Sequence, residues 1–228
     1  MKRLCILLFF FVSGAWAENV DSPYLKHAQE GDSRAQFYLA DTLVSAGEYQ
    51  QAENWAAKSA AQGDADAMAL LAQLKIHDPA TADYPQAKEL AEQAVQRGSE
   101  SGKVTLARIF VNTQAGKPDY TRAIELLESA SQDIESDSAV DAQMFLGLIY
   151  ANGVGTAQDD EKATFWFKRS STLSRTGYAE YWAGMLFLNG EKGFITANKQ
   201  RALQWLNLSC MEGFDTGCEE FERLSNGG

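Results

Sequence analysis

Residues 142–153 have the sequence AQMFLGLIYANG, and residues 179–190 repeat the pattern as AEYWAGMLFLNG. In both stretches, small and apolar residues recur at the spacing of one face of an α-helix. An Asn-Gly pair closes each stretch, as is typical of a helix end. A second apolar segment follows each one and contains an alanine and a tryptophan three residues apart, Ala163 with Trp166 and Ala202 with Trp205. The pattern therefore predicts two consecutive helix–turn–helix units.

Weaker copies of this unit extend toward the N-terminus in the same phase. The first helices are anchored by small residues at positions 35, 67, 102, 142 and 179, and the second helices by alanines at 52, 87, 123, 163 and 202. The steps within both series lie between 32 and 40 residues, which is the period of helical solenoids. We therefore expect an all-α fold, a right-handed α/α solenoid of about five repeats.

Partial units are expected to cap both ends of the solenoid. Leu25, Ala28 and Gly31 match the tail of a second helix, and Gly217, Phe221 and Leu224 match the start of a first helix. Terminal repeats would otherwise expose their apolar faces. Since no linker or change in composition divides the chain, residues 18–228 are expected to form one domain of about a dozen helices.

Small and large residues in the repeats suggest how the helices pack. The small side chains should let a neighbouring helix approach closely, and a tryptophan ring should fill the space between paired helices. The small residues are Ala40, Ala72, Ala107, Gly147 and Gly184, and the rings are those of Trp55, Trp166 and Trp205. Glycines that follow the second helices should adopt positive φ; these are Gly63, Gly98 and Gly213.

The first 17 residues have the features of a cleaved signal peptide. Lys2 and Arg3 precede the apolar stretch 4–12, which is too short to span a bilayer, and an A-x-A signal at 15–17 follows. We expect cleavage after Ala17 and export, most simply to a bacterial periplasm. The alternative is an uncleaved anchor, which the short apolar stretch disfavours. No later stretch is apolar enough to predict a membrane span.

Whether the cysteines form a disulfide depends on that compartment. Cleavage would remove Cys5 and leave Cys210 and Cys218. In an oxidising compartment, two cysteines predict one disulfide. The alternative, two free buried thiols, would be favoured if the chain is not exported.

Composition and motifs argue against several classes of function. The 228 residues contain 20 Lys and Arg against 31 Asp and Glu, a formal charge of −11 that disfavours nucleic-acid binding. Two histidines and three cysteines are too few for a typical zinc site. Asp32 or Ser33 fits a helix N-cap better than a nucleophile, and Gly153-Val154-Gly155 lacks the Lys-Ser or Lys-Thr of a P-loop. We expect no cofactor, no metal site and no enzyme activity.

The repeat units resemble the Sel1-like repeat, a relative of the tetratricopeptide repeat. That family's pattern is an alanine, a leucine-glycine pair, a tyrosine, a glycine-rich turn, a lysine-alanine pair, a tryptophan and a closing glycine. Residues 142–171 match it closely, residues 179–213 match it well, and residues 35–130 match it loosely. The cysteine spacing is similar to that of cysteine-rich Sel1-like proteins of Helicobacter, where paired cysteines join neighbouring helices.

The resemblance also implies a binding surface, because tetratricopeptide-like solenoids present their first helices on a concave face. Positions equivalent to groove residues can be assigned from each anchor. They are Arg34, Phe37, Asp41 and Val44 in the first repeat; Asp66, Gln73, Ile76 and His77 in the second; Val104, Arg108 and Asn112 in the third; Asp141, Met144, Leu148 and Asn152 in the fourth; and Tyr178, Tyr181, Met185 and Leu188 in the fifth. The apolar C-terminal members are expected either to bind a protein or to pack against neighbouring helices.

Three functions are compatible with the resemblance. The leading one is a non-enzymatic periplasmic protein that grips another protein, as an adaptor or inhibitor. Its narrower form is an immunity protein that neutralises a phospholipase (lipase) effector of type VI secretion, and the acidic charge could attract a basic partner surface. The second is an envelope regulator or assembly factor that binds a sensor kinase or cell-wall machinery. The third is a protein that binds or hydrolyses peptidoglycan or β-lactams, like the cysteine-rich relatives.

Overall fold

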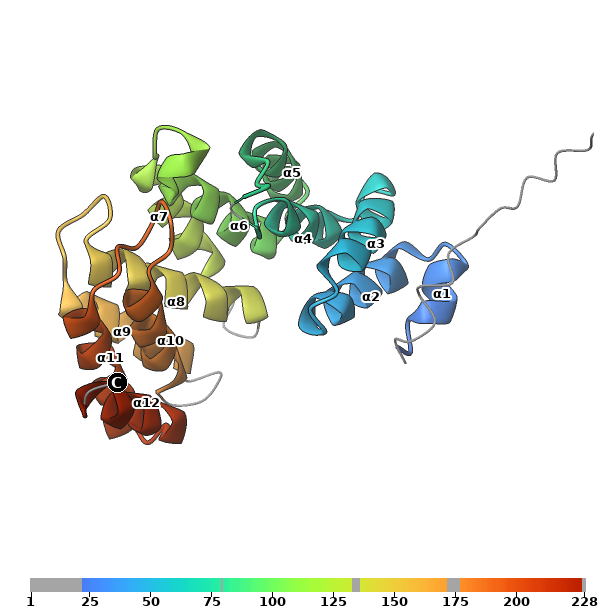
Figure 1. Cartoon of the computed structure of the whole chain (residues 1–228). Coiled ribbons are helices and arrows are strands. Elements are labelled where there is room, and N and C mark those ends of the chain that lie inside the picture. Colours follow the sequence, from blue (N-terminus) through green and yellow to red (C-terminus); the bar gives the residue numbers. More distant parts are fainter. Residues whose placement is uncertain (1–21, 79, 133–135, 172–176, 227–228) are drawn as a thin grey trace, which may run out of the picture.

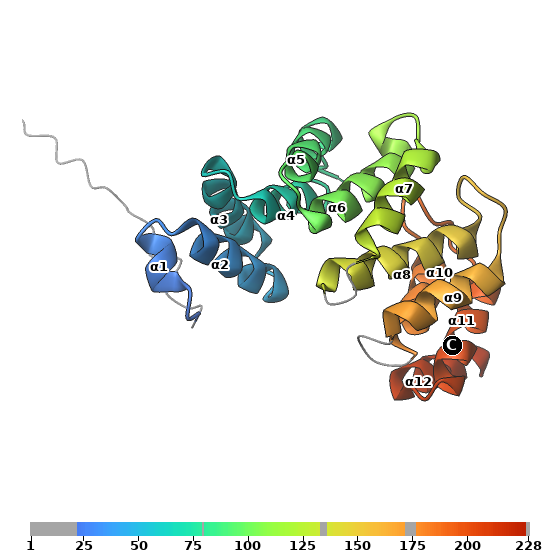
Figure 2. The ribbon, with the colours of Figure 1, turned by 180° about the vertical axis from the view of Figure 1, so that it is seen from behind.

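The protein is a curved array of α-helices (Figure 1, Figure 2). The computed structural model describes residues 22–78, 80–132, 136–171 and 177–226. The predicted signal peptide therefore lies outside the described residues. No helix among the described residues is long and apolar enough to cross a membrane.

Twelve α-helices and one short 3-10 helix make up the described part of the chain. They are α1 (Leu25–Gln29), α2 (Ser33–Ser45), α3 (Tyr49–Ala61), α4 (Ala65–Lys75), α5 (Tyr84–Gln96), α6 (Glu100–Val111), η1 (Thr113–Ala115), α7 (Tyr120–Ala130), α8 (Asp137–Asn152), α9 (Asp160–Ser171), α10 (Tyr178–Asn189), α11 (Lys199–Met211) and α12 (Asp215–Ser225).

The helices pack as five consecutive pairs, α2 with α3 through α10 with α11, and α1 and α12 cover the two ends. This arrangement confirms the predicted solenoid and both terminal half-units. Each first helix also contacts the second helix of the unit before it, so the stack is continuous. Buried Ala28 of α1 and buried Leu224 of α12 supply the apolar contacts of the caps.

Helix ends follow the local sequence signals. Asp32 is the N-cap of α2, and its carboxylate accepts a hydrogen bond from the backbone N–H of Ala35 at 2.6 Å. Gly63, Gly98 and Gly213 have φ values of +94°, +85° and +89°, as predicted for residues that follow second helices. These helix ends are thus set by a few adjacent residues, which is why the sequence could place them.

The packing inside the fourth repeat differs from the prediction in one residue. Gly147 of α8 faces the ring of Phe167, which is fully buried, whereas Trp166 is only partly buried. A Cβ atom at Gly147 would lie within 3.0 Å of three atoms of the Phe167 ring. The ring that fills this interface therefore belongs to the residue after the tryptophan, because that position points at the neighbouring helix.

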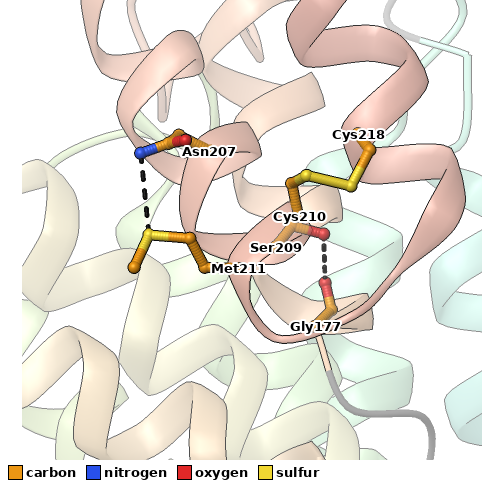
Figure 3. The surroundings of a disulfide bond; sticks show 6 residues. All are labelled: Gly177, Asn207, Ser209, Cys210, Met211 and Cys218. Carbon is orange, nitrogen blue, oxygen red and sulfur yellow. Dashed lines mark hydrogen bonds between the residues drawn. A yellow bond between two sulfur atoms is a disulfide. The ribbon is translucent and has the colours of Figure 1, made fainter.

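A disulfide joins the last repeat to its cap. Cys210 near the end of α11 is bonded to Cys218 of α12, with their Cα atoms 4.4 Å apart (Figure 3). In the same region, the Ser209 hydroxyl donates a hydrogen bond to the carbonyl oxygen of Gly177 at 2.7 Å. The end of α11 is thus held to the start of α10 as well as to α12.

Candidate functional site

The inner face of the solenoid contains a pocket of about 380 Å³ between α2, α4, α6 and the loop that follows α10. Its apolar wall is formed by Val44, Leu70, Leu74, Ile76 and Leu186. Its polar wall includes Gln73, His77, Tyr84, Thr105, Arg108 and Asn112. Five predicted groove residues of the second and third repeats therefore meet in one cavity; they are Gln73, Ile76, His77, Arg108 and Asn112.

The polar wall is ordered by contacts between successive repeats. The Gln73 amide donates to the Thr105 hydroxyl at 2.9 Å, which joins α4 to α6. His77 is exposed, and its ring lies 3.9 Å from the ring of Tyr49 at the start of α3. These contacts hold polar groups of neighbouring helices at the pocket in fixed positions.

The loop 190–198, between α10 and α11, forms the remaining wall and comes from far along the chain. It reaches back toward α6 and α7 (Figure 1), and the backbone N–H of Thr113 donates to the carbonyl oxygen of Gly193 at 2.9 Å. The Asn112 amide donates to the Lys192 carbonyl at 3.4 Å, and Arg108 forms a 3.6 Å ion pair with Glu191. The fifth repeat thereby closes the pocket that the first three repeats begin.

The same loop packs into the inner face at the fourth repeat. Phe194 is 9% exposed, and its ring centroid lies 4.9 Å from that of Phe145 in α8. The amide of Asn152, at the end of α8, donates to the Phe194 carbonyl at 2.9 Å. Two asparagines predicted to bind a partner, Asn112 and Asn152, therefore hold a segment of the chain itself.

Two predicted groove residues, Asp41 of α2 and Asp141 of α8, have carboxyl groups with raised pKa values. Partial burial, and then the negative charge of Asp137, raise the pKa of Asp41 in α2. Burial also raises the pKa of Asp141 in α8; the charge of Arg108 opposes this shift, and that of Asp137 adds to it.

Predicted residues of the first repeat form a second cluster. Arg34 bonds to Asp64 at 3.3 Å and Asp66 at 3.0 Å in the next repeat, and its guanidinium lies over the Phe37 ring at 4.8 Å. The hydrogen bond to Asp66 is the main cause that raises the pKa of Arg34. Arg34 thus joins neighbouring units, and its carboxylate partners come from this chain.

The predicted apolar residues of the last two repeats do not form one exposed patch. Leu148 is 2% exposed and belongs to the core, and Met144 packs against the same core. Tyr181 is partly buried, and its ring lies 5.4 Å from that of Phe214. For Leu148 the packing alternative is therefore correct, because its side chain is buried in the core.

Two other predicted residues of the fifth repeat are more open. Tyr178 is exposed at the start of α10, edge-on to Trp182 with ring centroids 6.1 Å apart. Met185 is partly buried. Neither residue lines the pocket between α2, α4 and α6.

Sequence reasoning missed loop 190–198, whose Gly190, Glu191 and Lys192 line the pocket. It also missed six other lining residues, which are Tyr49, Leu70, Leu74, Tyr84, Thr105 and Leu186. Burial raises the pKa of Tyr84, the charge of Glu191 raises it further, and a hydrogen bond with Asn112 lowers it. The one available signal was the long connection after Gly190, which the repeat pattern treats as a simple turn. Among the residues that the structure describes, no group of three His, Cys, Asp or Glu side chains could hold a metal ion.

The fold and its inner groove define a helical-repeat solenoid related to tetratricopeptide proteins. The chain belongs to the Sel1 repeat family, whose model matches residues 33–64, 65–99, 113–133, 140–174 and 177–214. The third match covers only part of its unit, and α6 completes that unit from Glu100 onward. The five matches confirm the predicted number of repeats.

Named relatives share the family assignment. The chain is 66% identical over 229 residues to the Sel1-repeat-containing protein YjcO of Escherichia coli K12, with all of both chains covered. A crystal structure of a sel1 repeat protein from Klebsiella pneumoniae subsp. pneumoniae is 67% identical, covers 90% of this chain and 98% of its own, and has a TM-score of 0.87. A thermophilic TPR protein of Thermus thermophilus shares the fold alone, at 17% identity and a TM-score of 0.53 over 85% of this chain and 98% of its own.

Proposed function

We propose that the protein is a non-enzymatic, exported binding protein whose inner groove takes a segment of another protein. The pocket between α2, α4, α6 and loop 190–198 carries this proposal. Its volume of about 380 Å³ lies in the range of ligand-binding pockets. Sel1 and tetratricopeptide repeats generally bind other proteins. The polar groups at the pocket bond to one another across repeats, an arrangement suited to recognition.

Export to the periplasm is part of the proposal. The N-terminal sequence supports it, and the Cys210–Cys218 pair is suited to an oxidising compartment. Cell fractionation should place the protein in the periplasm, and N-terminal sequencing of that material should begin at Glu18. A cytoplasmic protein that retains its first residues would refute this part.

Filling the pocket tests the binding site. Val44→Phe and His77→Trp each add a ring at the pocket wall, and His77 is exposed, so the second change should leave the fold intact. Ala57→Phe adds a ring to the exposed face of α3 and serves as the matched control. Cross-linking in intact cells should capture a partner with the wild type and the control, and much less with the pocket variants at unchanged melting temperature. Equal capture by all four proteins would refute the assignment.

The narrower roles differ in partner rather than in geometry. If the protein is an immunity protein, the cross-linked partner should be a phospholipase effector. If it is an adaptor or inhibitor, the partner should be another envelope protein, and if it is a regulator, the partner should be a sensor kinase or a cell-wall enzyme. Mass spectrometry of the cross-linked partner distinguishes them. Activity of the purified protein on nitrocefin would instead favour the β-lactam-hydrolysing alternative.

A further inference from the structure

Loop 190–198 links two repeats that are not neighbours. The helices that pack closely against each other belong to one repeat or to adjacent repeats. By contrast, the backbone N–H of Thr113, just after α6, donates to the carbonyl oxygen of Gly193 at 2.9 Å, which joins the third repeat to the fifth. The curvature of a solenoid is the sum of small rotations between neighbouring repeats. A link that skips the fourth repeat therefore constrains that sum.

The segment that makes this link is a compact turn, residues 191–195, which we call the latch turn. Its two ends are joined, because the N–H of Glu191 donates to the Ile195 carbonyl and the N–H of Ile195 donates to the Glu191 carbonyl, each at 2.8 Å. Gly193 lies at the tip with a φ of +85°. A Cβ atom there would overlap the side-chain amide of Asn112, so the glycine allows the tip to lie directly against the end of α6.

The latch turn is firmly attached on the side of α8. Phe194 and Ile195 are 9% and 4% exposed and belong to the hydrophobic core that includes α8. The ring of Phe194 packs beside that of Phe145, and the amide of Asn152 donates to the Phe194 carbonyl at 2.9 Å. Segments held by buried apolar contacts open only at high free energy. The latch turn therefore stays with the fourth and fifth repeats.

The contacts of the latch turn with α6 are polar and open to solvent. Arg108 and Glu191 form a 3.6 Å ion pair whose side chains are 47% and 32% exposed, and the Asn112 amide donates to the Lys192 carbonyl at 3.4 Å. Thr113 is exposed as well. Exposed ion pairs and hydrogen bonds each contribute little free energy, and segments held by them open most readily. Separation should therefore begin between the latch turn and α6.

We propose that the latch turn closes reversibly against the end of α6 and thereby sets the curvature of the solenoid. When closed, it holds the curved shape of Figure 1 and completes the pocket, whose wall includes Glu191 and Lys192. When it is released from α6, the first three repeats rotate away from the last two about the packing of α6 and α7 on α8, and the pocket widens. This inference goes beyond the proposed function, because it concerns the shape of the solenoid and holds whatever enters the pocket.

Hydrogen exchange of single backbone amides, measured by NMR on the purified protein with its disulfide intact, tests where the opening occurs. The N–H of Thr113 is bonded across the contact with α6, whereas the N–H of Glu191 is bonded within the latch turn. Release from α6 exposes the first amide and leaves the second protected. The Thr113 amide should therefore exchange faster than the Glu191 amide, by about tenfold or more.

Two variants weaken the contact from opposite sides. Asn112→Asp removes the amide donor but keeps the oxygen that accepts from the N–H of Gln114 at 2.8 Å, and Gly193→Ala places a Cβ against the Asn112 amide. Each should speed exchange of the Thr113 amide by about tenfold and raise the radius of gyration measured by small-angle X-ray scattering. Thr196→Ala, at an exposed position of the same loop, is the matched control and should change neither quantity.

Several results would overturn the inference. Equal exchange rates of the two amides in the wild type, or an equal increase of both in Asn112→Asp, would show that the loop opens as a whole. Unchanged Thr113 exchange in Asn112→Asp would show that the contact with α6 is not a latch. Faster exchange with an unchanged radius of gyration would show that the contact does not set the curvature, and an equal response of Thr196→Ala would show a general effect of changing the loop. Because these measurements use no partner, each of these failures leaves the proposed binding function standing.

Discussion

Replacing Gly147 by Ala should destabilise the protein by about 1–3 kcal/mol, as overpacking of a filled core does. Helix propensity alone predicts the opposite sign, since Ala in a helix interior is favoured over Gly by about 1 kcal/mol. Overpacking should win because the new Cβ would lie within 3.0 Å of the buried Phe167 ring, which meets the ring of Trp205 edge-on at 5.0 Å and has little room to move. Urea denaturation followed by circular dichroism at 222 nm measures the difference.

A double-mutant cycle isolates the contact. Phe167→Leu shrinks the ring, so the added methyl at position 147 should then fit, and the two changes together should cost about 1 kcal/mol less than their sum. Ala57→Gly on the exposed face of α3 measures the propensity effect alone and should cost about 1 kcal/mol. If Gly147→Ala stabilises the protein, or if the cycle is additive, the close approach of α8 and α9 at this residue is refuted.

Three further changes test other parts of the structure. Glu180→Gln should stabilise the protein at pH 8 and progressively less toward pH 4.5, because burial raises the pKa of the Glu180 carboxyl above 4.5 and the folded state loses stability as pH rises through that pKa. Urea titrations at several pH values measure this trend, and a pH-independent effect would contradict it. Replacing both Cys210 and Cys218 by Ser should lower the free energy of unfolding by about 2–3 kcal/mol, since the disulfide closes a short loop with a sequence separation of 8. An unchanged melting temperature would contradict this prediction. Asn152→Ala should cost about 1 kcal/mol and speed hydrogen exchange in loop 190–198, since it removes the bond to the Phe194 carbonyl; unchanged exchange would show that other contacts hold the loop.

The residues of the inner face show what the repeat phase could and could not predict about partner binding. Repeat phase placed Gln73, His77 and Arg108 on the inner face, and all three line the pocket. The same phase assigned Asn152 to a partner, although its amide is used by the chain itself. A repeat pattern fixes which face of a helix is turned inward, but it does not record which inward groups are already bonded.

The amino-acid sequence alone determined the number of repeats, the glycines that follow the second helices, the end caps and the cysteine pair. These depend on residues a few positions apart, because helical periodicity, N-caps and positive-φ glycines act within one or two turns. Only the tertiary structure decided that Phe167 rather than Trp166 fills the α8–α9 interface, and that loop 190–198 closes the groove. The loop meets Asn112 across a separation of 80 residues. Such a contact depends on the summed curvature of three repeats, which no local pattern encodes.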